Sequence, residues 1–232
     1  DITISWANTY QRTSLEDSAP STINRKLRAV TQMFNWAVRT ELLKTSPLQH
    51  LQRLQQSPQR ELRALTRREV QALMSASTKE TRGLWSLFLD TGMRKAEVSS
   101  LSWKEVDLDR QVITIEASKS KNKKPRIIPM TKRVLQVLQA RRRRAKKAQE
   151  ELVFPRVEGH SNFYEGCLKV FKRCCAWAGI KGVTIHSLRR SFAVRMLELG
   201  ASPGVVQRLL GHSTANLTLE VYAKVNTVDL RG

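Results

Sequence analysis

Apolar residues recur at steps of three and four along most of this 232-residue chain, and this period limits what the chain can fold into. The longest example spans residues 21–39, behind Ser21 and Thr22 as candidate N-caps. Its apolar positions alternate between steps of four and three, at Ile23, Leu27, Val30, Phe34 and Ala37. Similar spacing recurs in later segments, at residues 66–74, 84–89, 131–138, 163–177 and 184–199. The sequence therefore predicts a mainly α-helical protein.

One region has the pattern of β-strands instead. Residues 112–116 and 126–129 are rich in Val and Ile, and the polar segment 119–124 between them is typical of a hairpin connection. The expected fold class is therefore α+β, mainly α with a small antiparallel β-sheet.

A polar stretch divides the chain. Residues 55–61 contain no apolar residue and include Pro58, which is typical of an exposed linker. Thr66 and Glu69 then have the spacing of a capping box and predict the start of a new helix. The predicted organisation is a small helical domain over 1–56, completed by segments 2–10 and 47–54, a linker over 57–61, and a larger domain over 62–232.

The charge of the chain predicts a polyanionic partner. The sequence carries 41 Lys and Arg against 20 Asp and Glu, a formal net charge of +21. Nucleic acid is the first expectation and an anionic membrane the second. The sequence contains no apolar run of about 18 residues and no leader pattern, the features that would favour a membrane. We therefore expect a soluble, intracellular protein without a membrane partner.

Basic residues concentrate in two places. Residues 119–147 contain thirteen Lys or Arg and no acidic residue, and we expect the arginine run at the end of this stretch to form an exposed tail. One face of the 21–39 helix is also basic, and a solvated face explains it as well as a DNA-facing one. The candidate DNA contacts are Arg25, Lys26, Arg28, Lys121, Lys123, Lys124, Arg141, Arg142, Arg143 and Arg144.

The three cysteines indicate neither a disulfide framework nor a metal site. Cys167, Cys174 and Cys175 lack a CxxC spacing, and only His160 lies near them. We expect them to be buried as small hydrophobic residues, and we expect no metal and no cofactor.

Candidate catalytic residues lie at predicted helix ends. His186 and Arg189 share a face of the helix that begins near Thr184, beside an apolar stripe of Leu188, Phe192, Met196 and Leu199. Arg94 follows a helix end at Gly92, where it could point into a cleft or pair with Glu97 on the surface. His212 follows the helix that Ser202 and Pro203 begin and Gly211 ends, and Tyr222 lies ten residues further on.

Taken in order, these segments resemble the tyrosine recombinase (phage integrase) family, which includes lambda integrase and the Xer proteins. The segments that carry the resemblance are Thr91–Trp103, the lysine hairpin ending in Arg126–Met130, His186–Arg189, Leu209–His212 and Tyr222. The resemblance covers the chain from about residue 62, and the helix over 22–47 is similar to the last part of the family's core-binding domain. It implies a catalytic domain preceded by a partial DNA-clamping domain.

The resemblance also implies residue roles. Arg94 and Arg189 would hold the non-bridging oxygens of the scissile phosphate, and His186 would act as general base or proton relay. Lys119 would protonate the leaving 5′-oxygen, His212 would donate a hydrogen bond to the phosphate, and Tyr222 would be the nucleophile. Two bidentate guanidiniums suit the charge of a pentacoordinate phosphorus, and neighbouring cations help a phenol with a pKa near 10 to attack at neutral pH.

The expected function is site-specific cleavage and rejoining of duplex DNA through a covalent 3′-phosphotyrosyl intermediate, without metal or ATP. The alternatives are relaxation of DNA by a type IB topoisomerase and a protein that only binds recombination sites. The expected partners are double-stranded DNA, three further copies in a homotetramer on two synapsed sites, and an accessory directionality factor. The expected location is the bacterial cytoplasm, at the nucleoid. The His212–Tyr222 spacing is one residue longer than the family pattern, Arg190 stands where many members have histidine, and both ends are expected to be shortened.

Overall fold

The structure is a computed structural model that describes residues 1–56, 63–119, 124–155, 157, 159–160 and 162–211. The chain divides into two compact units, Asp1–Arg60 and Glu61–Gly232. The division falls within residues 55–61, the polar stretch from which the sequence predicts a linker.

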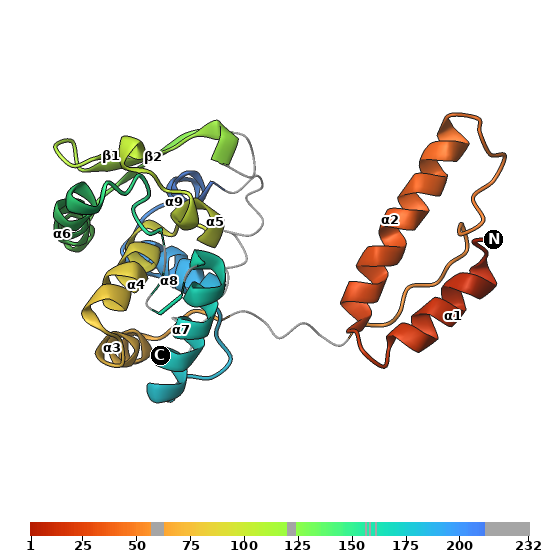
Figure 1. The fold of residues 1–232 in the computed structure, drawn as a ribbon, viewed down its shortest axis with the longest axis horizontal. Helices are drawn as coiled ribbons and strands as arrows, with labels where there is room; N and C mark the ends of the chain where they lie inside the picture. The colour runs from red at the N-terminus through yellow and green to blue at the C-terminus, as the bar shows by residue number, and fades with distance from the viewer. Residues whose placement is uncertain (57–62, 120–123, 156, 158, 161, 212–232) are drawn as a thin grey trace. The chain divides into compact units, whose positions relative to one another are not determined.

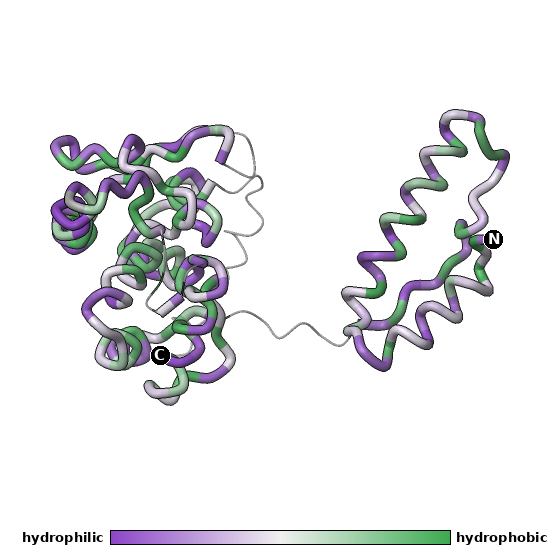
Figure 2. Tube along the Cα trace, in the orientation of Figure 1, coloured by the Kyte–Doolittle hydropathy of each residue, from purple (hydrophilic) through white to green (hydrophobic). Residues whose placement is uncertain are grey.

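The first unit is built on two helices, α1 (Ile4–Ser14) and α2 (Pro20–Arg39). Hydrophobic and hydrophilic residues alternate along α2, as expected of an amphipathic helix (Figure 2). Ile23 and Leu27 of α2 pack with Ala7 and Leu48 in a small core. The prediction of Ser21 and Thr22 as N-caps is wrong. Ala19 is the N-cap, because Pro20, which has no N–H to satisfy, takes the first helical position.

Residues 47–54 are not helical, contrary to the sequence expectation. Two side-chain amides hold this segment against the helices in an irregular conformation. Asn24 donates to the carbonyl oxygen of Leu54 at 2.9 Å and accepts from its N–H at 3.0 Å. Gln11 donates to the carbonyl oxygen of Gln52 at 2.9 Å. Partly buried polar backbone groups are thereby satisfied without a helix.

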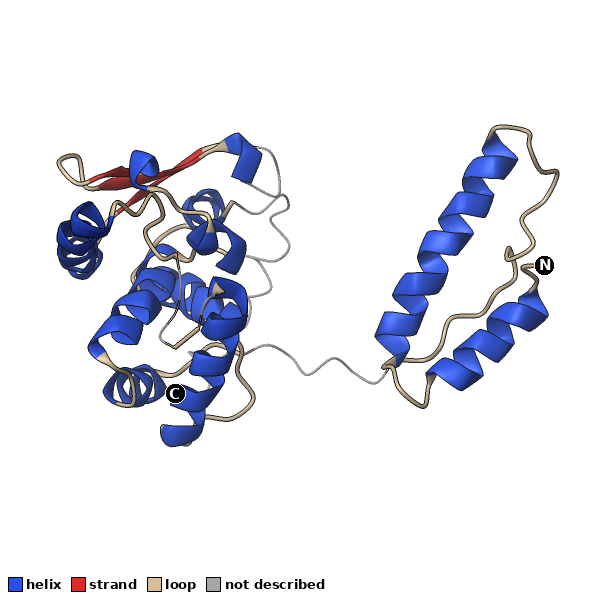
Figure 3. Ribbon diagram, in the orientation of Figure 1, coloured by secondary structure: helices blue, strands red, loops and turns tan. Residues whose placement is uncertain are grey.

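The second unit consists mainly of helices, with a small sheet at one of its edges (Figures 1 and 3). Its helices are α3 (Arg67–Ser75), α4 (Lys79–Thr91), α5 (Lys95–Ser99), α6 (Lys132–Ala148), α7 (Phe163–Trp177), α8 (Ile185–Glu198) and α9 (Pro203–Leu210), with 3-10 turns η1 (Trp103–Glu105) and η2 (Ala117–Lys119). The capping box of Thr66 and Glu69 forms as predicted.

The sheet is antiparallel in the order β1 (Val106–Asp107), β2 (Val112–Ile115), β3 (Arg126–Pro129). The β2–β3 pair is the predicted one, and its register places Ile115 opposite Arg126. The sequence did not reveal β1, because a strand of two residues is too short to show an alternating pattern.

Helix α4 forms the centre of the second unit and packs against α6 and α8. Ten of its thirteen residues are buried, among them Trp85. The ring of Trp85 packs edge-on against that of Phe171 of α7, with 5.3 Å between the ring centroids. The burial of α4 on nearly all sides fixes its C-terminal end at Gly92, from which the candidate site is built.

Apolar positions at two helix ends of this unit are not buried. Trp177 ends the 163–177 segment of helical spacing and Leu199 ends the predicted apolar stripe, yet they are 66% and 73% exposed, because each lies in the last turn of its helix or just beyond it. The arginine run expected to be an exposed tail lies within α6. Arg143 and Arg144 are exposed as expected, whereas Arg141 and Arg142 are partly buried. Amphipathic spacing is least informative at helix ends, where one residue decides whether the chain turns away from the core.

The three cysteines are free and buried, as predicted. Burial raises the pKa of the Cys167 thiol to about 12. The thiol is therefore protonated and unreactive at neutral pH. Among the described residues, no helix is long and apolar enough to cross a membrane.

Candidate active site

The candidate site is centred on the C-terminal end of α9. Ser202 caps the start of this helix, Pro203 is its first residue, and Gly211 ends it with a φ of 64°, all as predicted. The N–H of Gly211 donates to the carbonyl oxygens of Gln207 and Arg208, at 2.9 and 3.1 Å. The next three carbonyls, those of Leu209, Leu210 and Gly211, have no N–H partner within the helix, because a helix cannot satisfy the carbonyls at its own end.

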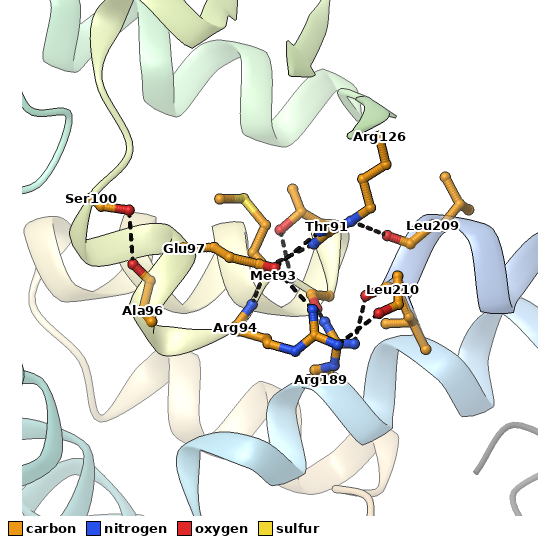
Figure 4. Close-up of polar contacts among 12 residues, drawn as sticks. Thr91, Met93, Arg94, Ala96, Glu97, Ser100, Arg126, Arg189, Leu209 and Leu210 are labelled. Carbon is orange, nitrogen blue, oxygen red and sulfur yellow. Dashed lines mark hydrogen bonds and ion pairs between the residues drawn. The ribbon is translucent and has the colours of Figure 1, made fainter. Parts of the chain in front are cut away.

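Three arginines supply those partners. Arg126 Nε donates to the carbonyl oxygen of Leu209 at 2.9 Å. Arg189 Nη2 donates to that of Leu210 at 2.6 Å, and Arg94 Nη2 to that of Gly211 at 2.7 Å. These side chains come from β3, α8 and the start of α5, and Figure 4 shows them meeting beside α9. We call Arg94, Arg126 and Arg189 the arginine cluster.

Arg94 is positioned by the turn between α4 and α5. Gly92 caps α4 with a φ of 61°, and a Cβ at this position would lie 2.6 Å from side-chain atoms of Phe192 and Leu210. Only glycine fits such a turn without strain. The backbone N–H of Arg94 then donates to Glu97 Oε2 at 2.7 Å, and its Nη1 donates to Glu97 Oε1 at 2.9 Å. The sequence left two alternatives open for Arg94, pointing into a cleft or pairing with Glu97. In the structure Arg94 pairs with Glu97 and also faces the arginine cluster.

Arg189 is buried and joins two helix ends. Its Nη1 donates to the carbonyl oxygen of Gly92 at 2.5 Å, while its Nη2 reaches α9. Burial, together with the positive charge of Arg94, lowers the pKa of Arg189 from 12.5 to about 9. The guanidinium is still charged at neutral pH, but it lies where an added anion is favourable.

Glu97 is the carboxylate of the cluster, and its side chain is 1% exposed. Burial by itself raises the pKa of this carboxyl, but the hydrogen bonds and charge of Arg126, with those of Arg94, outweigh it and lower the pKa. Glu97 is therefore ionised. One negative charge faces three guanidiniums, so the cluster keeps an excess of positive charge suited to an anion.

Sequence reasoning missed Arg126 as a site residue and placed Glu97 only as a surface partner. One signal was available for Arg126. It lies two residues before the buried Ile128 on the same strand, and alternate residues of a strand face the same side. An arginine on a buried face requires a carboxylate partner.

The structure does not bring Lys119 into contact with the arginine cluster. Its Nζ donates to Glu105 Oε2 at 2.5 Å and to the carbonyl oxygen of Ser100 at 2.7 Å. Glu105 is buried, and its other carboxylate oxygen has no hydrogen-bond partner among the described residues. His186 lies one turn before Arg189 on α8 and is exposed.

Four predicted site residues lie outside the described residues: His212, Tyr222, Lys121 and Lys123. The last described residue, Gly211, directly precedes His212. The arginine cluster therefore fixes the backbone at the point where the predicted catalytic histidine begins.

The remaining candidate DNA contacts divide by exposure. Arg25, Lys26 and Arg28 on α2 and Lys124 before β3 are exposed. On α6, Arg143 and Arg144 are exposed, whereas Arg141 and Arg142 pack against the protein. Among the described residues, no three or more His, Cys, Asp and Glu side chains group as a metal site would require.

Comparison with known proteins identifies the class. Residues 63–228 match the model of the phage integrase family. The chain is 30% identical to the tyrosine recombinase XerD of Lacticaseibacillus casei over 93% of its own length and 76% of the relative's. It is 28% identical to the tyrosine recombinase XerC of Xanthomonas campestris pv. campestris over 90% of its own length, and spans 65% of that protein.

Solved structures show the same fold. The Tn1549 transposon integrase in complex with a circular intermediate DNA matches with a TM-score of 0.74, 20% identity, and coverage of 95% of this chain and 81% of that one. A lambda integrase dimer bound to a COC' core site matches with a TM-score of 0.72 and 17% identity, over 95% and 64%. The fold and the sequence define a DNA strand-transferring enzyme of the tyrosine recombinase class. The chain belongs to the phage integrase family.

Proposed function

We propose that this chain is a site-specific recombinase that cleaves and rejoins duplex DNA through a covalent 3′-phosphotyrosyl intermediate. The observation that supports it best is the convergence of Arg94 and the buried Arg189 on consecutive residues at the end of α9. Two guanidiniums held side by side in a partly buried site match the oxygens of a phosphodiester.

In the proposed reaction the Tyr222 hydroxyl attacks the scissile phosphorus. The new bond joins the tyrosine oxygen to phosphorus, and the bond from phosphorus to the 5′-oxygen breaks. His186 takes the phenolic proton, and Lys119 gives a proton to the leaving oxygen. Arg94, Arg189 and His212 stabilise the charge that gathers on the non-bridging oxygens. The tyrosyl ester conserves the bond energy, so the reverse attack by a 5′-hydroxyl rejoins the strand without metal or ATP.

Lys119 must leave Glu105 for this role, since its ammonium group is held there in the structure. The exposed cations of α2 and α6 contact the DNA backbone in this proposal. Several of the relatives are described in complex with DNA, which supports duplex DNA as the partner. Four copies act together on two synapsed sites, with an accessory factor setting direction, in the bacterial cytoplasm at the nucleoid. The unit Asp1–Arg60 acts as part of the DNA clamp.

Covalent capture tests the proposal. The protein is mixed with a pool of duplexes in which a randomised segment contains a nick, and adducts that survive denaturation in SDS are isolated and sequenced. We expect an adduct with a defined sequence, formed equally well in the presence of a metal chelator. Arg189→Ala and Tyr222→Phe should abolish it while most DNA binding remains.

The two other tyrosines provide matched controls. Tyr10→Phe and Tyr164→Phe remove the same hydroxyl elsewhere and should leave the adduct intact. An adduct that survives Tyr222→Phe contradicts the nucleophile assignment. Relaxation of supercoiled DNA without sequence preference would instead favour a type IB topoisomerase, and sequence-specific binding without any adduct would favour a binding-only protein.

A further inference from the structure

Arg126 has every nitrogen of its guanidinium engaged. Nη1 and Nη2 donate to the two oxygens of Glu97, at 2.9 and 2.7 Å, and Nε donates to the carbonyl oxygen of Leu209. The side chain is only 7% exposed. A planar fork used in this way holds its partners in one geometry, which a flexible ammonium group cannot do. Arg126 is therefore built to fix other groups rather than to bind substrate.

The group that it fixes most directly is Glu97. Oε1 of this carboxylate accepts from both Arg126 and Arg94, each at 2.9 Å. Oε2 accepts from the side chain of Arg126 and from the backbone N–H of Arg94, each at 2.7 Å. Because Arg126 occupies both oxygens, the guanidinium of Arg94 makes only one of these hydrogen bonds to Glu97. Its other terminal nitrogen points to the end of α9.

Loss of Arg126 would change this division. Glu97 would keep its charge and its place beside Arg94, and Arg94 could then turn its own fork onto both oxygens. A bidentate pair of this kind would withdraw the donors of Arg94 from a phosphate. The carbonyl oxygen of Leu209, three residues before His212, would lose its partner at the same time.

We infer that Arg126 is a positioning residue that keeps the guanidinium of Arg94 oriented toward the scissile phosphate, by taking Glu97 as its own partner and anchoring the end of α9. This inference rests on the proposed role of Arg94 in binding the phosphate. It assigns to Arg126 no contact with DNA, so it does not make this residue a catalytic one.

A pair of substrates distinguishes positioning from folding. Both carry the sequence captured by the wild-type protein, one with the natural scissile phosphodiester and one with a methylphosphonate at the same place. The methylphosphonate has no negative charge for Arg94 to neutralise, while its leaving 5′-oxygen is unchanged. Release of the strand bearing the 5′-hydroxyl is timed for each. The ratio of the two rates within one variant does not depend on how much of that variant is folded.

We expect Arg126→Ala to slow cleavage of the phosphodiester by about 100-fold, the cost of a misplaced catalytic group, and to slow cleavage of the methylphosphonate far less. Arg126→Lys, which retains the charge but not the fork, should lie between the wild type and Arg126→Ala on the phosphodiester. Arg133→Ala is the matched control, because Arg133 makes a comparable two-point contact with a different buried carboxylate, that of Asp90, at 2.8 and 2.6 Å. It should change the ratio of the two rates little.

Equal losses on both substrates would overturn the inference, since they would mean that Arg126 supports only the fold or the strand that follows Lys119. An Arg126→Lys variant as active as the wild type would also overturn it. If the wild-type protein captures no DNA at all, it is the proposed function that fails, and the two failures are thus distinguishable.

Discussion

The arginine cluster and the Arg141–Arg144 run of α6 are both rich in arginine, yet their side chains have different surroundings. The cluster draws its arginines from three elements that are far apart in sequence. Arg94 and Arg126 share one buried carboxylate, and the three arginines donate to three successive carbonyls. The arginines of the run follow one another on a helix, where successive side chains point about 100° apart. Neighbouring arginines of the run therefore meet different surroundings.

The run is accordingly divided among several roles. Arg141 donates to the carbonyl oxygen of Val153 at 2.6 Å, lies over the ring of Phe154 at 4.3 Å and pairs with Glu80 at 3.0 Å. Arg142 lies over the ring of Trp103 at 4.9 Å. Arg143 and Arg144 are exposed. The difference between the two regions teaches that a high local content of arginine is not enough to form an anion site. The tertiary structure must also bring the arginines together in a buried place where their positive charge exceeds that of the carboxylates.

The largest expected effect tests the carboxylates of the two regions. Glu97→Gln removes the charge that compensates Arg94 and Arg126, and should destabilise the second unit by about 3–5 kcal/mol, as breaking a buried ion pair does. Glu80→Gln removes a 45% exposed partner of Arg141 and should cost less than about 1 kcal/mol. Urea unfolding followed by tryptophan fluorescence, to which the buried Trp85 contributes, measures both. Similar values would remove the distinction between the regions.

A smaller effect tests the division within the run. Arg141→Ala leaves the buried carbonyl of Val153 without its donor and should destabilise the unit by about 1–3 kcal/mol. Arg143→Ala removes an exposed side chain and should change the stability by no more than about 0.5 kcal/mol. The same unfolding experiment compares them, and equal losses would restore the sequence expectation of a uniform tail.

The partly exposed ion pair of Arg63 and Glu69 should make the stability of the protein depend on pH. The hydrogen bonds from Arg63 lower the pKa of Glu69 from 4.5 to about 2, against the opposing effect of burial. A lowered pKa in the folded state contributes stability above pH 4.5 that is lost as the pH falls toward 2. The stability difference between the wild type and Glu69→Gln should therefore shrink over this range. A difference that stays constant from pH 6 to 2 would show that only the cap, and not the charge, is important.

The last prediction concerns DNA binding, and the substitutions that test it should affect the fold least. Arg143→Gln and Arg144→Gln together should weaken binding evenly across DNA sequences and reduce the salt slope by about one for each phosphate that is no longer neutralised. Arg141→Gln should leave the salt slope unchanged, because its guanidinium is held by the protein. A reduction confined to one DNA sequence, or a reduced slope for Arg141→Gln, would contradict this assignment. Binding titrations at several salt concentrations provide the measurement.

Much of the local structure could be predicted from sequence. The capping box at Thr66, the α9 boundaries at Ser202 and Gly211, and the β2–β3 pair follow from rules that involve only neighbouring residues. The failures lie where distant residues decide. Residues 47–54 are irregular because Asn24 and Gln11 hold their backbone, and Arg141 is packed because Val153 and Phe154 lie beside it.

The candidate site divides in the same way. The order of the motifs was enough to identify the family and to single out Arg94, Lys119, His186 and Arg189. The sequence by itself determined the start of α3, the end of α4 and both ends of α9, since caps and glycine turns act over three or four residues, and it determined the large positive charge. Only the tertiary structure decided that Glu97 is buried and belongs to Arg126 as well as Arg94, and that Lys119 lies against Glu105. Charge partners of this kind depend on which elements pack together, and the energy of each contact depends on its burial.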